Sequence, residues 1–258
     1  MYEIIKSRFG KAIRHYDNHA VAQKIIADRL FNLIDREQRT ENVLEIGCGT
    51  GNLSRRLLEL SPGKLILNDI CPGYAEILRK KLASPVSTDP EDSTARILFS
   101  CGNAQEIIGK RFPAKFNLIA SASAIQWLSD PLQFLIGCRS LLAADGLLAV
   151  STFAPDNMQE VAFSSGCGLQ YPSPEVIGRT LEQHYRLLHL STGEITLTFP
   201  DPVDVLKHLK LTGVNGVNST GWTKKDLTAF QERYQTVRNP DGSYPLTYRP
   251  VFILCKQK

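Results

Sequence analysis

The chain lacks the residue patterns that mark several common kinds of protein. Its 258 residues contain no Cys-x-x-Cys pair and no histidine-rich cluster, which argues against a zinc site, and we expect no metal. The six cysteines are scattered without paired spacing, so we expect reduced thiols. No Gly-Lys-Ser or Gly-Lys-Thr follows its glycines, which excludes a Walker loop. The five histidines are scattered too, and no Ser/His/Asp constellation can be argued.

Long apolar runs and strong net charge are also absent. No apolar stretch approaches the roughly 18 residues of a membrane span, and the first six residues lack a signal-peptide core. We therefore expect a cytoplasmic protein that does not bind membranes. The net charge of +4 is too small to argue for nucleic acid. Hydrophobic residues make up 43% of the chain and charged residues 22%, which predicts a packed core rather than disorder.

The most informative segment is residues 43–51, an apolar run that ends in Gly-x-Gly-x-Gly. Residues 53–58 then begin a helical pattern, which predicts a buried strand, a tight turn and a helix. A second apolar run, 65–67, leads to Asp69, about 18 residues beyond Gly51 and near the spacing expected for an acid that binds a ribose. Together these features predict a nucleoside site. A tight turn without a ligand is the alternative.

The spacing of the glycines and the charge of Glu45 indicate which nucleoside the site would bind. A dinucleotide fold prefers Gly-x-Gly-x-x-Gly, with a pyrophosphate on the helix amides, whereas this chain has Gly47, Gly49 and Gly51. Glu45 lies two residues before the first glycine, where a carboxylate would repel a phosphate but suits the ammonium group of an amino acid. The ligand that combines adenosine with an amino acid and has no phosphate is S-adenosylmethionine (SAM). The segment resembles the first motif of class I SAM-dependent methyltransferases.

Strands and helices alternate as far as residue 153, which implies a parallel sheet with right-handed crossovers. The resemblance implies more: an α/β, Rossmann-like class I methyltransferase fold with a seven-stranded, mostly parallel sheet and an antiparallel last strand. We divide the chain into an N-terminal helical lid (1–38), a SAM-binding core (39–155) and a C-terminal part (156–258). The last part would hold a substrate cap insertion and the final strands of the sheet.

Three local predictions can be checked against a structure. The polar composition of residues 85–94 predicts a surface loop. A helix over 133–143 should be stopped by the Asp-Gly pair at 145–146. Residues 185–190 should pair with residues 194–199 as a hairpin turned at the three residues between them.

Candidate ligand contacts lie where the predicted strands end, because ligands bind outside the carboxyl ends of parallel strands. Asp69 and Ile70 follow the second strand, Asn103 and Ala104 the third, and Ser121 belongs to the end of the fourth. In the family, the position of Asn103 is commonly an aspartate that accepts from the adenine amino group. An asparagine carbonyl can accept the same bond without the charge. Capping of the following turn is the alternative role.

The amino-terminal segment from Tyr16 to Gln23 resembles the helix that closes over SAM in several small-molecule methyltransferases. Tyr16 would then orient the substrate or close the site, and Gln23 would contact SAM. Further segments extend the match over nearly the whole chain: Phe9–Ala12, Ala27–Leu30, Ile125–Pro131, Ser151–Phe153, Leu209–Asn215 and Tyr244–Tyr248. With these segments the chain resembles the malonyl-acyl-carrier-protein O-methyltransferases of biotin synthesis.

This resemblance implies methylation of the free carboxylate of malonyl-acyl-carrier protein, in the pimeloyl branch of biotin synthesis. That carboxylate is ionised at neutral pH, so no general base is required. A methyltransferase for another small acid, a quinone precursor or an amine is the alternative. A SAM-binding regulatory module without turnover is a third hypothesis. The sequence predicts no oligomeric state.

Candidate substrate-binding residues can be selected by the chemistry of their side chains. Trp127 would form a wall of the methyl-transfer pocket, or else pack in the core. An arginine pairs well with a carboxylate, and the candidates are Arg14, Arg139, Arg179 and Arg249. The carrier protein is acidic in this family, so exposed lysines would steer it by forces that fade with salt; the candidates are Lys207, Lys210, Lys224 and Lys225.

Overall fold

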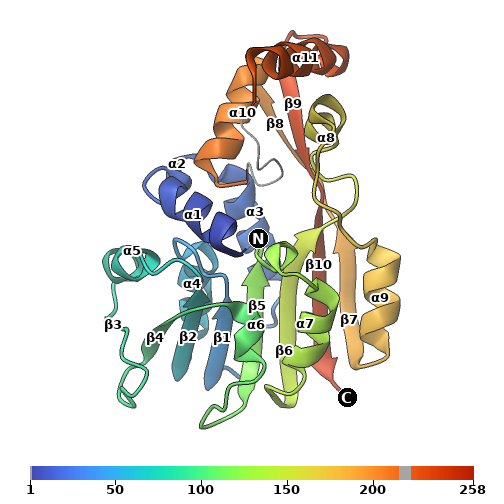
Figure 1. The fold of residues 1–258 in the computed structure, drawn as a ribbon. Helices are drawn as coiled ribbons and strands as arrows, with labels where there is room; N and C mark the ends of the chain where they lie inside the picture. The colour runs from blue at the N-terminus through green and yellow to red at the C-terminus, as the bar shows by residue number, and fades with distance from the viewer. Residues whose placement is uncertain (1, 215–221) are drawn as a thin grey trace. The chain divides into compact units, whose positions relative to one another are not determined.

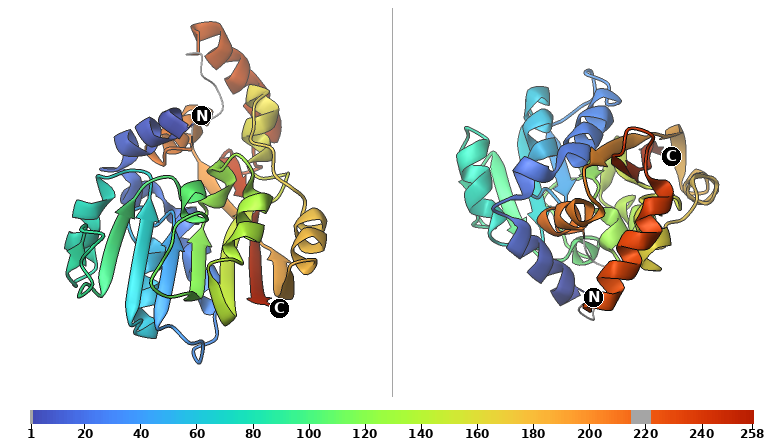
Figure 2. Two further views of the ribbon diagram at one scale, coloured as in Figure 1. Left: turned by 60° about the horizontal axis from the view of Figure 1, so that its bottom comes forward. Right: turned by 90° about the horizontal axis from the view of Figure 1, so that it is seen from above.

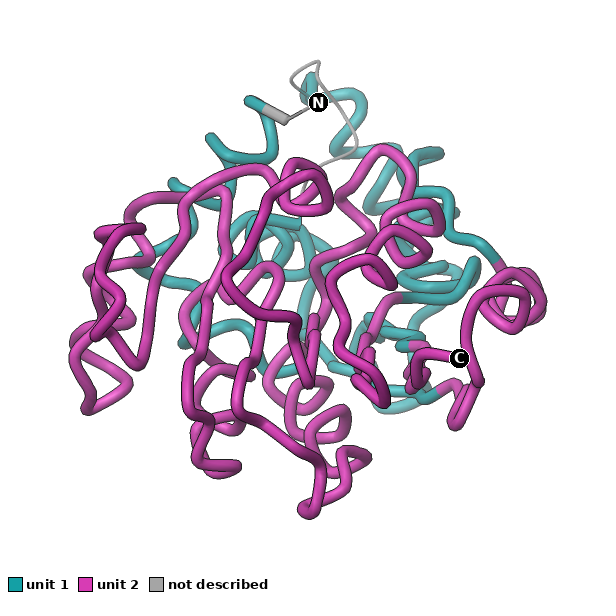
Figure 3. Tube along the Cα trace, turned by 90° about the horizontal axis from the view of Figure 1, so that it is seen from below, with its two compact units in different colours: residues 1–22, 153–172, 193–250 teal, residues 23–152, 173–192, 251–258 magenta. Residues whose placement is uncertain are grey.

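The computed structural model describes residues 2–214 and 222–258, which form two compact units (Figure 3). The sheet unit comprises residues 23–152, 173–192 and 251–258. The second unit comprises residues 1–22, 153–172 and 193–250. The lid, core and cap roles that the sequence assigns to 1–38, 39–155 and 156–258 remain predictions, because these units are defined by packing and not by role.

The sheet unit is built on one eight-stranded sheet with the order β3-β4-β2-β1-β5-β6-β10-β7 (Figure 1). Its strands are β1 (Asn42–Ile46), β2 (Lys64–Asp69), β3 (Val86–Ser87), β4 (Ile97–Cys101), β5 (Phe116–Ala122), β6 (Leu142–Phe153), β7 (Tyr185–Thr192) and β10 (Pro250–Gln257). The pairs from β3 to β6 are parallel, whereas β10 runs antiparallel to β7. The predicted fold class is therefore confirmed, and the two-residue edge strand β3 makes the eighth strand.

Helices cover both faces of this sheet, which explains why its central strands read as unbroken apolar runs. In β1 and β2 all residues except the first are buried. Helices α4 and α7 lie on opposite faces (Figures 1 and 2). The helical elements are α3 (Val21–Asn32), α4 (Asn52–Leu57), η1 (Leu58–Leu60), α5 (Tyr74–Lys81), α6 (Ala104–Ile107), η2 (Ile125–Trp127), α7 (Pro131–Cys138) and α9 (Pro174–Glu182).

Two of the local predictions fail in the sheet unit. Strand β3 lies inside the segment predicted as a loop, because Val86 and Ser87 extend the edge of the sheet beside β4. The helix predicted over 133–143 ends at Cys138, and β6 already begins at Leu142. The Asp-Gly pair at 145–146 does not stop a helix but lies within β6, where the register against β5 shifts and Asp145 has a φ of 60°. This is a bulge in a strand.

The predicted hairpin is wrong as well. Strand β7 pairs with β10, from Thr192 opposite Val251 to Tyr185 opposite Gln257. Residues 195–199 form β8, which pairs in a separate two-stranded sheet with β9 (Tyr244–Tyr248). The two segments thus take partners that are distant in the sequence, and the turn signal between them marks a change of sheet.

The second unit contains the sheet β8-β9 and helices from three parts of the chain. These are α1 (Tyr2–Ala12), α2 (Tyr16–His19), α8 (Gln159–Ser165), α10 (Pro202–Leu211), α11 (Lys224–Tyr234) and η3 (Gln235–Val237). Buried polar pairs join them to β9. His208 Nε2 lies 2.9 Å from the Tyr248 hydroxyl, and Glu160 Oε2 accepts from Thr247 N at 3.2 Å. Burial, and then the charge of His19, lower the pKa of His208 to about 4, so its imidazole is neutral at pH 7.

Candidate functional site

The loop between β1 and α4 carries three glycines with positive φ, 69° at Gly47, 50° at Gly49 and 84° at Gly51. Two of these glycines are required by the packing of the protein itself. A Cβ on Gly47 would lie 2.2 Å from the Cβ of Ala124, and one on Gly51 would lie 2.8 Å from Leu78 Cδ2. A Cβ on Gly49 would meet nothing within 4 Å. Gly49 is therefore the position where a ligand has room to approach the backbone.

Asp69, at the end of β2, holds this loop in place. Its Oδ2 accepts from Gly49 N and its Oδ1 from Cys71 N, each at 2.9 Å. Burial raises the pKa of Asp69 to about 6, against the opposing effect of the bonds from the Cys71, Gly49 and Ile70 backbone. A carboxylate has about four acceptor sites, so one remains beyond these three backbone bonds. Asp69 can thus accept from a ligand hydroxyl while it anchors the glycine loop.

Neighbouring strand ends are bonded to one another. Asn68 Nδ2 donates to the carbonyl oxygens of Ser100 at 2.9 Å and Gly102 at 3.1 Å. Ser121 is buried, and its hydroxyl donates to the Ile46 carbonyl at 2.9 Å. These bonds join β2 to β4 and β5 to β1, and β1 itself pairs with β2, so the site residues that follow these strands lie at one edge. The proton of Ser121, a predicted SAM contact, is already used within the protein.

Glu45 is a carboxylate buried next to the glycine loop, with an exposed fraction of 1%. Its Oε2 has no hydrogen-bond partner in the described part of the chain. Burial raises the pKa of Glu45 to about 8, while the Ser54 hydroxyl lowers it and the charge of Asp69 raises it further. The carboxyl group is thus mainly protonated at neutral pH. A cationic group, bound directly or through water, would supply the missing partner of Oε2 and favour ionisation.

Further predicted SAM contacts follow β2 and β4, and of these Asn103 is the predicted adenine contact. Ile70 and Asn103 are half-buried. The Asn103 side chain caps α6, because its Oδ1 accepts from Gln105 N at 3.0 Å. The capping role that the sequence left open is therefore present. The second lone pair of the amide oxygen remains for a ligand donor, and Ala104 follows as the first residue of α6.

The end of β5 presents two polar side chains to which the sequence analysis gave no role. Ser123 has a φ of 54°, unusual for a residue other than glycine, and its buried hydroxyl has no partner among the described residues. Gln126 Nε2 donates to the Ser123 carbonyl at 2.7 Å, whereas its buried Oε1 is unpaired in the same part of the chain. Gln126 lies within segment 125–131, which matches the family, and this position in the sequence could have indicated a role for it. Trp127 is half-buried and ends η2.

Buried polar atoms without partners are uncommon in folded proteins and call for an explanation. Gln23 of α3 is a further case, with an exposed fraction of 8% and an unpaired Oε1 within the described residues. In the sheet unit, such oxygens belong to Gln23, Glu45, Ser123 and Gln126. A polar ligand or ordered water at the strand ends would satisfy them.

The predicted substrate arginines divide between the two compact units. Arg139 is exposed at the end of α7, just before β6 begins, and so lies at the edge of the sheet opposite the strand ends. Arg179 is exposed on α9, where its Nε donates to the Glu175 carbonyl at 3.4 Å. The structure therefore does not bring Arg139 to the ligand edge, and it ties Arg179 to its own helix.

The remaining candidates belong to the second unit. Arg14 is exposed between α1 and α2, and Tyr16 is the half-buried first residue of α2. Arg249 lies between two carboxylates: its Nε is 3.3 Å from Asp156 Oδ2, and its NH1 contacts Glu194. Its charge is thus already balanced, so binding a substrate carboxylate would require it to exchange partners. The roles of these three residues remain predictions.

Residues 2–214 and 222–258 contain no group of three or more His, Cys, Asp or Glu side chains arranged to hold a metal ion. Every helix in these ranges is too short or too polar to span a membrane.

Comparisons with known proteins agree with this geometry. Residues 44–148 match a family model described as a methyltransferase domain. Over 272 aligned positions, the chain is 38% identical to the malonyl-[acyl-carrier protein] O-methyltransferase of Bacteroides thetaiotaomicron, covering 99% of this chain and 98% of that protein. The match includes both ends of the chain and both compact units.

Solved structures show the same fold at low sequence identity. A putative methyltransferase from Bacillus halodurans is 14% identical, with a TM-score of 0.62 over 89% of this chain and 97% of that one. The N-methyltransferase NodS from Bradyrhizobium japonicum, solved with S-adenosyl-L-homocysteine, is 12% identical, with a TM-score of 0.52 over 90% of this chain and 85% of that one.

Proposed function

Because the chain belongs to the malonyl-acyl-carrier-protein O-methyltransferase family, we infer that it is an enzyme that methylates malonyl-acyl-carrier protein with SAM as the methyl donor. The acceptor is the free carboxylate of the malonyl thioester. The observation that carries this inference is the 38% identity over 99% of the chain, since it includes the segments outside the SAM-binding core.

The strand-end residues fit SAM as the donor. The open space beside Gly49 gives a ligand access to the loop backbone, and the unpaired Oε2 of Glu45 suits an ammonium group. Asp69 would accept from a ribose hydroxyl, with Ile70, Asn103 and Ala104 beside the adenine and Gln23 as a further contact. When bound, SAM supplies a methyl group made electrophilic by its sulfonium.

The residues of the chain then have little proton chemistry to perform. The nucleophile is a carboxylate that is already ionised at neutral pH, so a general base is not needed. Alignment and exclusion of water are the remaining tasks, and such effects are together worth on the order of 7–11 kcal/mol. We assign them to Tyr16 and Trp127, and we add Gln126 because its orphaned oxygen lies next to Trp127 in η2.

The product explains the place of the reaction in metabolism. A methyl ester removes the negative charge from the end of the malonyl group, which then resembles an ordinary acyl chain. Fatty-acid synthesis can extend such a chain towards pimeloyl, as biotin synthesis requires.

Genetic complementation tests this function. Expression of the chain should restore growth without biotin to an auxotroph that lacks only the methylation step, and the Gly49→Val variant should not. A methyltransferase for a quinone precursor or an amine, or a SAM-binding module without turnover, would leave the auxotroph dependent on biotin. Absence of rescue by the folded wild-type protein would contradict the proposal.

A further inference from the structure

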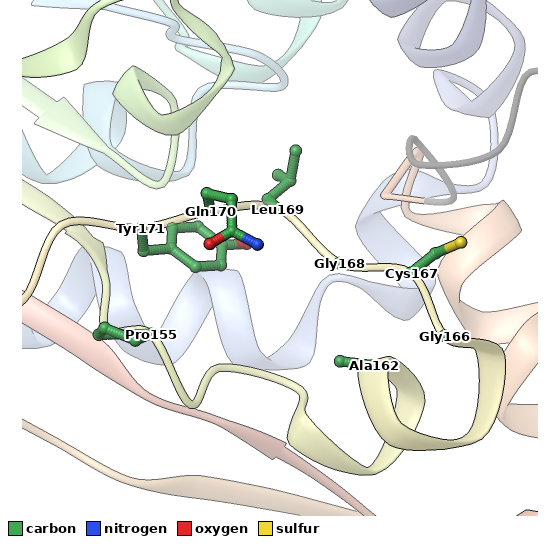
Figure 4. Close-up of a pocket in the computed structure, with 8 residues that line it drawn as sticks. All are labelled: Pro155, Ala162, Gly166, Cys167, Gly168, Leu169, Gln170 and Tyr171. Carbon is green, nitrogen blue, oxygen red and sulfur yellow. The ribbon is translucent and has the colours of Figure 1, made fainter.

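A small cavity in the second unit is lined by residues that the SAM site does not use. It has a volume of about 270 Å³ and is bounded by Pro155, by Ala162 of α8 and by residues 166–171 (Figure 4). In the view of Figure 4, Pro155 and Tyr171 are drawn at one end of the lining and Gly166 with Cys167 at the other. Sites for whole drug-sized ligands measure roughly 300–1,000 Å³. This cavity is therefore suited to one part of a larger ligand.

The wall of the cavity is held by its own hydrogen bonds. Gly166, with a φ of 72°, ends α8 and donates its N–H to the Ala162 carbonyl at 2.9 Å. The Ser165 hydroxyl donates to the Cys167 carbonyl at 3.0 Å and accepts from Cys167 N at 3.1 Å. These local bonds shape the loop without a ligand.

The lining contains no charged side chain. An ion in the cavity would have no counter-charge among the lining residues, which makes its desolvation costly. The cavity therefore suits neither a malonyl carboxylate nor a sulfonium. Its polar side chains are a hydroxyl, an amide and a thiol, those of Tyr171, Gln170 and Cys167.

Tyr171 gives the cavity a hydrogen-bond donor. Its hydroxyl oxygen accepts from Asn157 Nδ2 at 3.3 Å, a bond that leaves the phenolic proton able to donate. Asn157 is buried and is itself held by Arg249 N, which donates to Asn157 Oδ1 at 3.0 Å. Burial raises the pKa of Tyr171 to about 12, so the phenol keeps its proton throughout the neutral range. A neutral acceptor such as a carbonyl oxygen suits this donor.

We propose that this cavity binds the neutral arm of amide and thioester groups that ties an acyl group to its carrier protein, with Tyr171 donating to a carbonyl of that arm. The proposal rests on the proposed function, because a carrier-linked substrate is what brings such an arm to the enzyme. It adds a binding site for the part of the substrate that is neither the carboxylate nor the protein.

Protection of a thiol tests occupancy without turnover. Cys167 lines the cavity, and Cys101, exposed in the sheet unit, serves as an internal control. The wild-type protein is alkylated with N-ethylmaleimide, and each cysteine is followed by peptide mass spectrometry. Acetyl-pantetheine, a neutral thioester of this kind, should slow alkylation of Cys167 by about fivefold or more near saturation and leave Cys101 unchanged. Free malonate should protect neither thiol. An unchanged rate at Cys167 would overturn the proposal.

Variants then connect the cavity with catalysis. Tyr171→Phe removes the donor, and Ala162→Leu fills part of the cavity. Gln159→Leu is the matched control, since Gln159 is exposed on the same helix and outside the lining. The first two variants should raise KM for malonyl-carrier protein by about five- to tenfold, as for a lost neutral hydrogen bond or a steric block, with SAM affinity retained. Gln159→Leu should match the wild type.

The outcomes separate this proposal from the proposed function. If the wild-type enzyme methylates malonyl-carrier protein but Tyr171→Phe and Ala162→Leu keep its KM, the cavity has another role and the function stands. If the wild-type enzyme does not methylate this substrate, the function fails, and thiol protection alone decides whether the cavity binds the arm.

Discussion

At the residue scale, Gly47 and Gly49 share a positive φ but differ in their surroundings, and the difference predicts two distinct defects. Gly49→Ala would place a methyl group in open space at the cost of some backbone strain from its positive φ, so we expect a folded protein whose SAM affinity falls by more than about tenfold. Gly47→Ala would bring two Cβ atoms within 2.2 Å and should instead lower thermal stability. Calorimetry of both variants separates these effects. Wild-type affinity in Gly49→Ala would show that the ligand lies elsewhere.

Glu45 predicts a pH dependence of stability. Its pKa is about 8 in the folded protein and close to 4.5 in the unfolded chain. Between these values the folded state binds a proton that the unfolded state releases, so the free energy of unfolding falls as pH rises through this window and levels off above about pH 8. Asp69 contributes in the same direction up to about pH 6.

The Glu45→Gln variant isolates this effect, because it removes one titrating group and keeps the shape of the side chain. Denaturant unfolding at a series of pH values should show a smaller loss of stability with rising pH in the variant than in the wild type. Parallel pH profiles for the two proteins would contradict the raised pKa of Glu45.

Local sequence predicted the placement of some candidate residues better than that of others, for physical reasons. Glu45, the three glycines and Asp69 belong to short segments whose strand–turn–helix geometry is set locally, so their spacing alone placed them at one edge. The importance of Ser123 depends on a hydroxyl that tertiary packing leaves unpaired. Whether an arginine can bind a substrate carboxylate depends on which acidic side chains already pair with it. The carboxylates that pair with Arg249 lie far from it in the sequence, so local sequence does not reveal them.

At the element scale, the central strands could be predicted because burial on both faces makes them short, continuous apolar runs. The last strands could not be paired correctly from the sequence. The sequence around Gly193 is typical of a hairpin turn. In the structure, Gly193 donates its N–H to the Pro250 carbonyl at 2.8 Å. Strand β7 pairs with β10 and β8 pairs with β9, so both partner strands come about 60 residues later in the chain. Nonlocal pairing of this kind leaves no periodic signal at the turn.

The amino-terminal helices give an element-scale prediction. No strand lies within residues 2–20, and α1 packs within the second unit, where the Phe9 ring closes the space beside Gly213. A protein that lacks residues 1–20 should therefore keep a folded sheet and bind SAM, while methyl transfer falls by at least about tenfold through lost closure.

Circular dichroism, SAM calorimetry and a turnover assay would be compared for the truncated and full-length proteins, with Tyr16→Phe as a milder variant. Full activity after truncation would refute a lid role for Tyr16.

At the scale of the whole molecule, a net charge of +4 gives little general attraction for an acidic partner, so steering must come from local groups. Lys207 is bonded to Asp204 at 2.8 Å and is partly neutralised. Lys210, Lys224 and Lys225 are exposed. They are the better candidates for contact with the carrier protein.

Ionic strength tests this steering. Raising salt from about 0.05 to 0.5 M should lower kcat/KM for malonyl-carrier protein and leave kcat/KM for malonyl-pantetheine nearly unchanged. In the double variant Lys224→Ala, Lys225→Ala, kcat/KM for malonyl-carrier protein should rise much less at low salt than it does in the wild type. An equal salt response for both substrates would show that charge on the carrier is not recognised.

The most direct measurement of the proposed activity is the intact mass of malonyl-carrier protein after incubation with the enzyme and SAM. The expected result is the gain of one methyl group per malonyl group, as an ester that alkali removes, with free malonate a much poorer acceptor. An unchanged carrier mass, together with methyl transfer to a free acid, a quinone precursor or an amine, would contradict the assignment.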